Sequence, residues 1–196
     1  MDARRLAILR AAGRAFRRSG FAAAGMRDIA AEADLSPGNL YHYFKGKDEI
    51  LFFCQDQFLD RMLAVLDRAR REGGPVEERL RQVLIAHVLG ILDEVNGTAA
   101  HLEVDGLPEP LRTRLVAKRD RYETGIRRLV AAGRREGAFR RVNARLVTRA
   151  MLGALNWTVR WFHPEGRDPA RTVAAGVADF LLAGLAAPAG TRVPER

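Results

Sequence analysis

Hydrophobic residues recur every three or four positions through most of the chain, and no stretch alternates apolar and polar residues in the way that predicts a β-strand. In residues 3–18, Leu6, Leu9, Ala12 and Phe16 form one apolar stripe, and six arginines lie on the outer side of the predicted helix. Ser19-Gly20 should end this segment, because glycine is common just after the end of a helix. The pattern therefore predicts an all-α protein that opens with an amphipathic helix.

Further segments with the same spacing bring the total to about nine predicted helices. Ser36 and Asn143 stand where their side chains can cap a helix, and Asp168-Pro169 is a cap and first-turn pair before the last one. The segment 76–95 carries an apolar stripe too wide for a surface helix, so we expect it to be central. After the first helix, the predicted helices are 27–33, a short one from 37, 47–70, 76–95, 99–107, 111–135, 143–161 and 169–185.

The stretch from Met26 to Lys47 predicts two short helices joined by a tight turn at Asp34-Leu35. Leu40 and Phe44 lie four residues apart and should face inward. A short helix with an open N-terminus and outward polar groups fits the major groove of DNA, while the helix before it braces backbone contacts. The side chains expected to face outward are Asn39, Tyr41, His42, Tyr43 and Lys45.

The order I-A-x-x-A-x-L-S-x-G-x-L-Y-x-Y-F-x-x-K, residues 29–47, resembles the DNA-binding domain of the TetR family of bacterial repressors, and the similarity extends upstream through residues 8–21. Two positions depart from the family pattern. Gly25 stands where the family usually has a hydroxyl residue that caps the second helix, and Asp34 stands where it usually has a glycine in the turn.

The resemblance implies a ligand-responsive repressor that binds double-stranded DNA at a pseudo-palindromic operator. Asn39, Tyr41 and His42 would contact bases or the adjacent backbone, and Tyr41, Tyr43 and Lys47 would hold phosphates. The predicted domains are a helix-turn-helix DNA-binding domain at 1–47, a ligand-binding and dimerisation domain at 48–186, and a disordered tail at 187–196. The full set of predicted DNA-binding residues is Arg4, Arg5, Arg27, Ser36, Pro37, Gly38, Asn39, Tyr41, His42, Tyr43 and Lys47.

The last two predicted helices are apolar on more than one side, which suits helices that pack on their own domain and on a partner. We therefore expect a homodimer with two helices from each subunit at the interface. A larger monomeric bundle is the alternative.

The segment G-A-L-N-W-T-V-R-W-F-H-P-E-G, residues 153–166, together with L-P-E-P-L-R and R-D-R-Y-E upstream, is similar to TetR-type repressors of fatty-acid and sterol-ring catabolism that respond to acyl-CoA thioesters. This resemblance implies a small-molecule effector, an acyl-CoA, with arginines at the pocket mouth that meet its phosphates. The candidate arginines are Arg119, Arg121, Arg127, Arg128 and Arg160. The predicted ligand-binding residues are Leu84, His87, Val88, Leu92, Tyr122, Ile126, Trp157 and Trp161.

Three alternatives stay open for this domain. The aromatic residues can be ordinary core. A multidrug-efflux repressor would bind lipophilic cations through buried carboxylates, and a helical lipid-binding or structural dimer module would belong to a different class. The candidate carboxylates are Glu94, Glu103, Asp105 and Glu123.

Composition does not locate the sites, but it argues against secreted, membrane-spanning, catalytic and metal-binding classes of protein. The net charge of +9 suits a polyanionic partner, yet residues 1–50 contribute +3 (nine basic, six acidic) and the rest +6 (24 basic, 18 acidic). Cys54 is the single cysteine, and no signal peptide or membrane span is evident, so we expect a cytoplasmic protein. Both serines are explained as caps, and the four histidines lack metal-ligand spacing, so we expect no enzyme, cofactor or metal.

Overall fold

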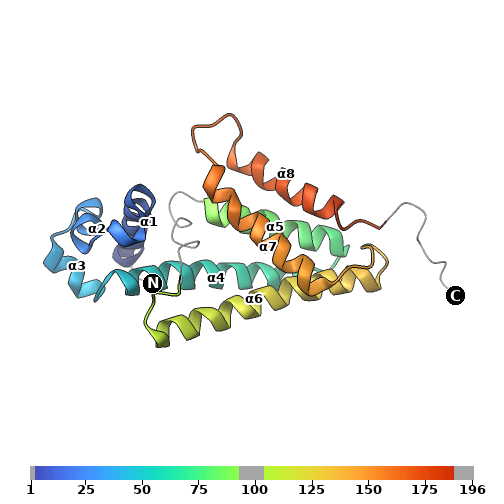
Figure 1. Cartoon of the computed structure of the whole chain (residues 1–196), viewed down its shortest axis with the longest axis horizontal. Coiled ribbons are helices and arrows are strands. Elements are labelled where there is room, and N and C mark those ends of the chain that lie inside the picture. The colour runs from blue at the N-terminus through green and yellow to red at the C-terminus, as the bar shows by residue number, and fades with distance from the viewer. Residues whose placement is uncertain (1–2, 93–103, 188–196) are drawn as a thin grey trace. The chain divides into compact units, whose positions relative to one another are not determined.

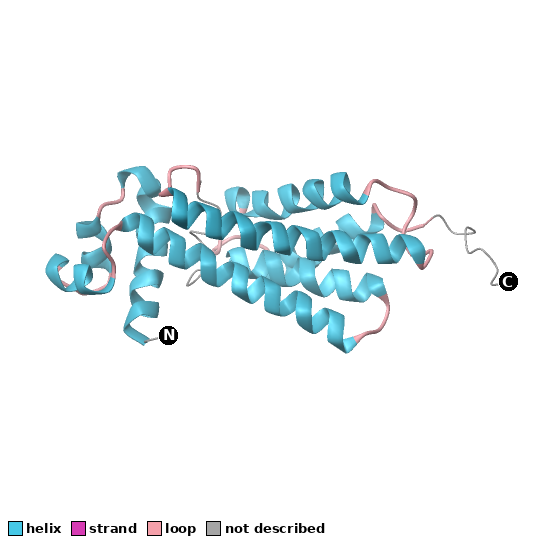
Figure 2. Ribbon diagram, turned by 90° about the horizontal axis from the view of Figure 1, so that it is seen from below, coloured by secondary structure: helices cyan, strands magenta, loops and turns pink. Residues whose placement is uncertain are grey.

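The computed structural model describes residues 3–92 and 104–187, and within these ranges all regular structure is helical (Figures 1 and 2). Apart from an isolated bridge between Phe139 and Ala186, no strand pairing occurs in the described part, so the all-α prediction is confirmed. The helices are α1 (Ala3–Ala23), α2 (Met26–Glu32), α3 (Pro37–Tyr43), α4 (Lys47–Glu72), α5 (Val76–Leu92), α6 (Glu109–Arg135), α7 (Ala144–Trp161) and α8 (Ala170–Ala183).

Two sequence predictions fall wholly or largely outside the described residues. Of the helical piece predicted at 99–107, only 104–107 is described, and these residues form a loop with a turn. Of the predicted tail at 187–196, only residue 187 is described. Among the helices that are described, none is long and apolar enough to cross a membrane.

The chain divides into two compact units, and three helices contribute to both of them. The first unit comprises Met1–Asp60 and Gly90–Arg119, and the second comprises Arg61–Leu89 and Asp120–Arg196. The division therefore falls inside α4, α5 and α6. The functional boundary after residue 47 remains a prediction, because compactness does not assign function.

In the first unit, α1, α2, α3 and the first turns of α4 enclose a small apolar core. Ile8, Ile29 and Leu40 have at most 1% of their surface exposed. The rings of Phe16 and Phe21 meet edge to face with centroids 5.2 Å apart. This core fixes α3 against the rest of the unit and leaves its other face free.

Helix α1 continues three residues beyond the break that the sequence predicts. Gly20 has φ 76° and ψ 158°, a conformation that suits glycine, and a short helical stretch follows it to Ala23. The predicted interruption at Ser19-Gly20 is therefore confirmed as a kink rather than an end.

In the second unit, α5 is central, as predicted. Leu80, Leu84 and Val88 are completely buried, and Ile126 of α6 and Leu155 of α7 are buried as well. The core of this unit therefore lies along α5.

Helix starts were predicted well where a side-chain cap sets them. The Asn143 side chain accepts hydrogen bonds from the amides of Arg145 and Leu146, which confirms the predicted cap of α7. The cap predicted for α8 was wrong by one residue. Pro169 is the N-cap rather than the first helical residue, and no side chain caps this helix. Without a capping side chain, helix starts commonly shift by one position.

Candidate functional site

The turn between α2 and α3 is a helix-ending motif with a left-handed residue. Asp34 has φ 54°, the Leu35 amide donates to the Ala30 carbonyl at 2.9 Å, and the Asp34 amide donates to the Ala31 carbonyl at 3.2 Å. These two bonds form a Schellman motif, which places glycine or a short polar residue at the left-handed position. Asp34 can therefore stand where the family usually has glycine, because a short polar side chain tolerates the left-handed conformation.

Both short helices begin with caps. The Asp28 carboxylate accepts a 2.8 Å hydrogen bond from the Gly25 amide at the start of α2. At the start of α3, the Ser36 hydroxyl accepts from the Asn39 amide at 3.2 Å, and Pro37 occupies the first helical position. The predicted Ser36 cap is confirmed.

Helix α3 presents its predicted DNA-binding side chains to solvent. Leu40 is completely buried, whereas Tyr41 has 54% of its surface exposed. Asn39 and His42 are also exposed, and Tyr43 is half-buried. The helix therefore has one anchored face and one free face, the arrangement that a recognition helix needs.

The N-terminus of α1 lies beside this free face. Arg4, Asn39, His42 and Tyr43 line one open hollow of about 530 Å³ together with Leu35. The Arg5 guanidinium donates to the Tyr43 carbonyl at 3.4 Å. The structure thus brings together five of the predicted DNA-binding residues from two helices. Arg27 is exposed in the first turn of α2.

Lys47 has a contact set that the sequence did not reveal. Its ammonium group donates to the carbonyls of Phe21 and Ala22 at 3.0 Å each and to that of Ala24 at 3.4 Å. It also lies 4.9 Å from the centre of the Phe21 ring. All three N–H groups therefore have acceptors within the protein, and the predicted phosphate contact remains a prediction.

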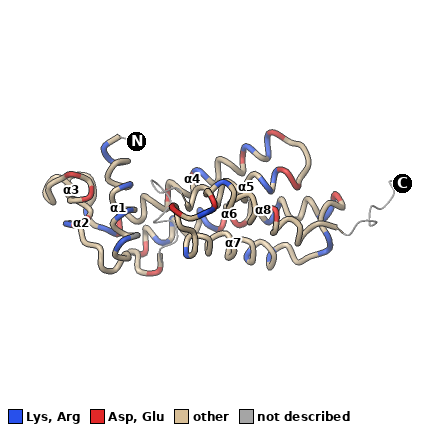
Figure 3. The backbone as a smooth tube through the Cα atoms, turned by 90° about the horizontal axis from the view of Figure 1, so that it is seen from above, with Lys and Arg blue, Asp and Glu red and all other residues tan. Residues whose placement is uncertain are grey.

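Charge distribution does not single out α3. Lys and Arg residues occur on helices of both units (Figure 3). Two arginines of α1 are paired internally, because Arg14 and Arg18 contact Glu32 of α2 at 2.7 and 2.8 Å. Hydrogen bonds from Arg18 and Arg14 lower the pKa of Glu32. This pairing ties α1 to α2.

Six of the eight predicted ligand-binding residues are core residues. His87 joins three helices, because its Nδ1 lies 3.0 Å from the Tyr122 hydroxyl and its Nε2 lies 2.9 Å from Asn156 Oδ1. The Asn156 oxygen can only accept, so Nε2 donates and Nδ1 accepts from Tyr122. Burial lowers the pKa of His87 to about 4 and raises the pKa of Tyr122. The buried six are Leu84, His87, Val88, Leu92, Tyr122 and Ile126.

The two predicted ligand-binding tryptophans lie at the surface instead. Trp157 is 63% exposed and Trp161 is 47% exposed. Both line a shallow hollow of about 350 Å³ with Phe180 and other small or apolar residues of α7 and α8. The structure separates them from the buried six because the inner face of α7 is occupied by residues such as Leu155 and Thr158.

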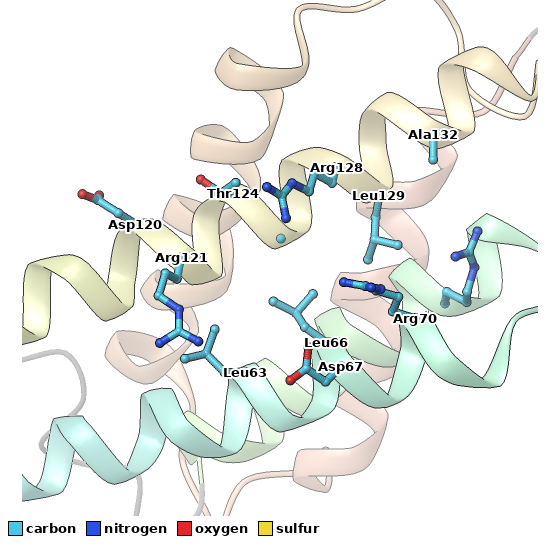
Figure 4. Close-up of a pocket in the computed structure, with 12 residues that line it drawn as sticks. Leu63, Leu66, Asp67, Arg70, Asp120, Arg121, Thr124, Arg128, Leu129 and Ala132 are labelled. Atoms are coloured by element: carbon cyan, nitrogen blue, oxygen red, sulfur yellow. The ribbon is translucent and has the colours of Figure 1, made fainter.

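A groove of about 640 Å³ opens along α4 and α6, with Arg79 of α5 also in its lining (Figure 4). In the close-up, Arg121 and Arg128 of α6 and Arg70 of α4 reach towards the space between the two helices. The complete lining is Leu63, Leu66, Asp67, Arg70, Arg79, Asp120, Arg121, Thr124, Gly125, Arg128, Leu129 and Ala132.

Two of the five arginines that the sequence offered as phosphate contacts line this groove. Arg121 and Arg128 line it, whereas Arg119 donates to Gln55 at 2.8 Å and Arg127 donates to Thr124 at 3.2 Å. Arg160 is exposed on α7. The sequence analysis missed Arg70 and Arg79. The seven-residue spacing of Arg121 and Arg128 was visible in the sequence and places them on one helix face.

Comparisons with known proteins agree along the chain. Residues 8–52 match the family model "Bacterial regulatory proteins, tetR family", and residues 73–185 match "Tetracyclin repressor-like, C-terminal domain". The chain is 26% identical over 190 residues to the HTH-type transcriptional repressor KstR2 of Rhodococcus jostii (strain RHA1), covering 94% of this chain and 92% of that protein.

Solved structures share the fold. The TetR family transcriptional regulator PfmR from Thermus thermophilus is 32% identical, with a TM-score of 0.80 over 90% of this chain and 97% of that one. AibR in complex with isovaleryl coenzyme A and operator DNA is 24% identical, with a TM-score of 0.79 over 94% of this chain and 99% of that one, which shows the common fold. The chain belongs to the tetR family of bacterial regulatory proteins and is a DNA-binding transcriptional regulator with an N-terminal helix-turn-helix and a tetracycline-repressor-like C-terminal domain.

Proposed function

We propose that the protein is a homodimeric repressor that leaves its operator when a CoA thioester binds to the C-terminal domain. It would act in the cytoplasm, where operator DNA is available. The observation that carries the DNA-binding part is the free face of α3, on which Asn39, Tyr41 and His42 are exposed while Leu40 is buried.

On DNA, α3 would lie in the major groove. Asn39, Tyr41 and His42 would face base edges or the adjacent backbone, and Arg4 would meet a phosphate from the hollow that it shares with α3. Ser36, Pro37 and Gly38 would lie closest to the DNA backbone, because they form the N-terminal end of α3, where the helix dipole favours phosphates. Arg5, Arg27, Tyr43 and Lys47 complete the proposed interface.

The dimer would form through α7 and α8. Leu146, Trp157 and Phe180 expose 67%, 63% and 78% of their surface in the protomer. Large apolar residues exposed in a contiguous region mark an interaction surface. A second copy of this chain would cover them in a four-helix arrangement and hold two recognition helices for successive major grooves of a pseudo-palindrome.

The effector proposal rests on the similarity of residues 153–166 to repressors that respond to acyl-CoA, and on a fold that holds isovaleryl coenzyme A in AibR. Of the predicted pocket residues, the six buried ones, from Leu84 to Ile126, would receive the acyl chain. The alternative of a lipophilic cation, which needs buried unpaired carboxylates, is less well supported. Glu123 pairs with Arg149 at 3.3 Å, and Asp105 is exposed. Glu94 and Glu103 lie outside the described residues.

Helix α4 supplies a physical link for release. It is continuous from Lys47, directly after the helix-turn-helix, to Glu72, so a ligand that displaces its C-terminal turns acts on the helix that leads into the DNA-binding domain. Repression would end when the two recognition helices no longer fit the operator together.

The test is fluorescence anisotropy of the protein on a labelled fragment of its own promoter, titrated with acyl-CoAs of increasing length and, separately, with a cationic dye. We expect release by one chain-length class of thioester. Release by the dye alone would indicate that the effector is a lipophilic cation and not a thioester. If neither compound releases DNA, the repressor proposal stands but the proposed effector is wrong.

The same assay tests the DNA-binding residues. Tyr41→Ala should weaken operator binding roughly 10- to 100-fold, the loss expected for a side chain at the base edges. Its circular dichroism should not change, because the side chain is exposed. His163→Ala, exposed in the loop after α7, is the control. Equal affinity of the two variants would rule out α3 as the recognition helix.

A further inference from the structure

The groove along α4 and α6 concentrates positive charge from three helices. Arg70 comes from α4, Arg79 from α5, and Arg121 and Arg128 from α6. Asp67 and Asp120 are the acidic residues of the lining, so four positive and two negative charges leave a formal +2. In Figure 4 the Asp120 carboxylate points away from the space between the helices.

The arginines of the groove are poorly neutralised by the protein. Within residues 3–92 and 104–187, the ion pairs do not include Arg70, Arg121 or Arg128. Arg79 comes only to 3.9 Å from Glu136, and its Nε is buried with no hydrogen-bond partner in the described part of the chain. A buried donor without an acceptor costs free energy that a bound anion would recover.

A solvated basic face accounts for only part of this arrangement. Arg70 lies in the last turn of α4, where the helix dipole favours a cation. Arg121 and Arg128 lie in the middle of α6, two turns apart, where the helix dipole does not stabilise a cation. Their convergence with Arg79 on a concave surface is the geometry of an anion site rather than that of a solvated convex face.

The floor of the groove is apolar. Leu63 and Leu66 of α4 and Leu129 and Ala132 of α6 line it between the charged groups. Gly125 lets the two helices approach, because a Cβ there would lie 2.5 Å from Leu66 Cδ1. A volume of about 640 Å³ lies within the usual range for small-molecule sites. An ion as small as inorganic phosphate would leave this floor uncovered.

We infer that this groove binds the nucleotide end of coenzyme A, with its diphosphate and 3′-phosphate on the four arginines and its pantetheine arm along the leucines. The inference rests on the proposed function and assigns a place to the part of the effector that carries no acyl chain. Guanidinium groups suit this end because they bind phosphate oxygens through two parallel hydrogen bonds. The site therefore accepts unacylated coenzyme A as well as its thioesters.

The test is calorimetric titration of the full-length protein with coenzyme A. The groove variant is Arg121→Gln/Arg128→Gln, and the control is Arg134→Gln/Arg135→Gln, which removes two exposed charges from the last turn of the same helix. Each lost phosphate contact should weaken binding on the order of 10-fold, so the groove variant should bind coenzyme A roughly 100-fold more weakly than wild type. The control should bind nearly as wild type. An acyl-pantetheine, which lacks the nucleotide, should bind all three proteins alike.

Each outcome separates this inference from the proposed function. If an acyl-CoA releases wild type from the operator but the groove variant binds coenzyme A as tightly as the control, the inference is overturned and the repressor proposal stands. If coenzyme A binds through Arg121 and Arg128 but no thioester releases DNA, the groove assignment stands and the effector role fails. If neither coenzyme A nor any thioester binds wild type, both are overturned.

Discussion

The apolar face of α7 and α8 makes a strong prediction about assembly, because Phe180 is 78% exposed in the protomer. Full burial of a phenylalanine side chain is worth about 1.5–3 kcal/mol. A symmetric interface contains the residue twice, so Phe180→Glu should cost the dimer about 3–6 kcal/mol, to which the desolvation of two carboxylates adds. A loss of about 4 kcal/mol lies within this range. This corresponds to roughly a 1000-fold increase in the dimer dissociation constant.

Sedimentation velocity over a wide concentration range measures this effect directly. The variant should sediment as a monomer at concentrations where wild type is a dimer, and its circular dichroism should match wild type because the side chain does not belong to the protomer core. Val116→Glu is the control, since Val116 is 42% exposed and belongs to α6 rather than to α7 or α8. If Phe180→Glu and wild type dimerise equally, the exposed face is not the interface, and the protein must pair through another surface.

Three further predictions concern the stability of the fold. Lys47→Met should lower the free energy of unfolding by about 1–3 kcal/mol, because the carbonyls of Phe21, Ala22 and Ala24 lose their donor. An unchanged midpoint of unfolding in urea would show that these hydrogen bonds do not stabilise the fold. Burial lowers the pKa of His87 from 6.5, the ordinary value of an exposed histidine, to about 4 in the folded protein, so the unfolded state takes up the proton first as the pH falls. The contribution of His87 to the free energy of unfolding should be constant above about pH 6.5 and fall by about 1.4 kcal/mol per pH unit towards pH 4. Unfolding of His87→Gln should therefore depend less steeply on pH in this range than that of wild type, and equal slopes would contradict the assignment. Asp34→Val should destabilise by about 1–2 kcal/mol while Asp34→Gly stays near wild type, since only the β-branched side chain resists a positive φ, and equal effects would refute this.

The elements that the sequence predicted well are those set by local chemistry. Ser36 and Asn143 cap their helices because a side-chain oxygen reaches an amide two or three residues away, and that distance is visible in the sequence. Leu40 and Phe44 are both buried, as their four-residue spacing predicts, with Leu40 in α3 and Phe44 at its C-cap. The helix-turn-helix follows from such local rules.

The features that the sequence did not reveal depend on tertiary structure. Lys47 meets a carbonyl 26 residues earlier in the chain, and no local pattern marks that contact. Arg70 and Arg79 join the groove only because α4 and α5 bring them to α6. Trp157 and Trp161 have the same helical spacing whether they fill a core or an interface, so the sequence predicted their apolar face but not its exposure.

The proposed binding of coenzyme A in the groove would have a metabolic consequence. Its arginines and leucines would face the part that every coenzyme A thioester has in common, so the acyl chain alone would have to distinguish one thioester from another. Unacylated coenzyme A competes for the same place without supplying that chain. Operator occupancy then follows the fraction of the coenzyme A pool that is acylated rather than the absolute amount of any thioester. A cell that depletes free coenzyme A as it charges the pool would derepress at a lower thioester concentration than a cell with coenzyme A to spare.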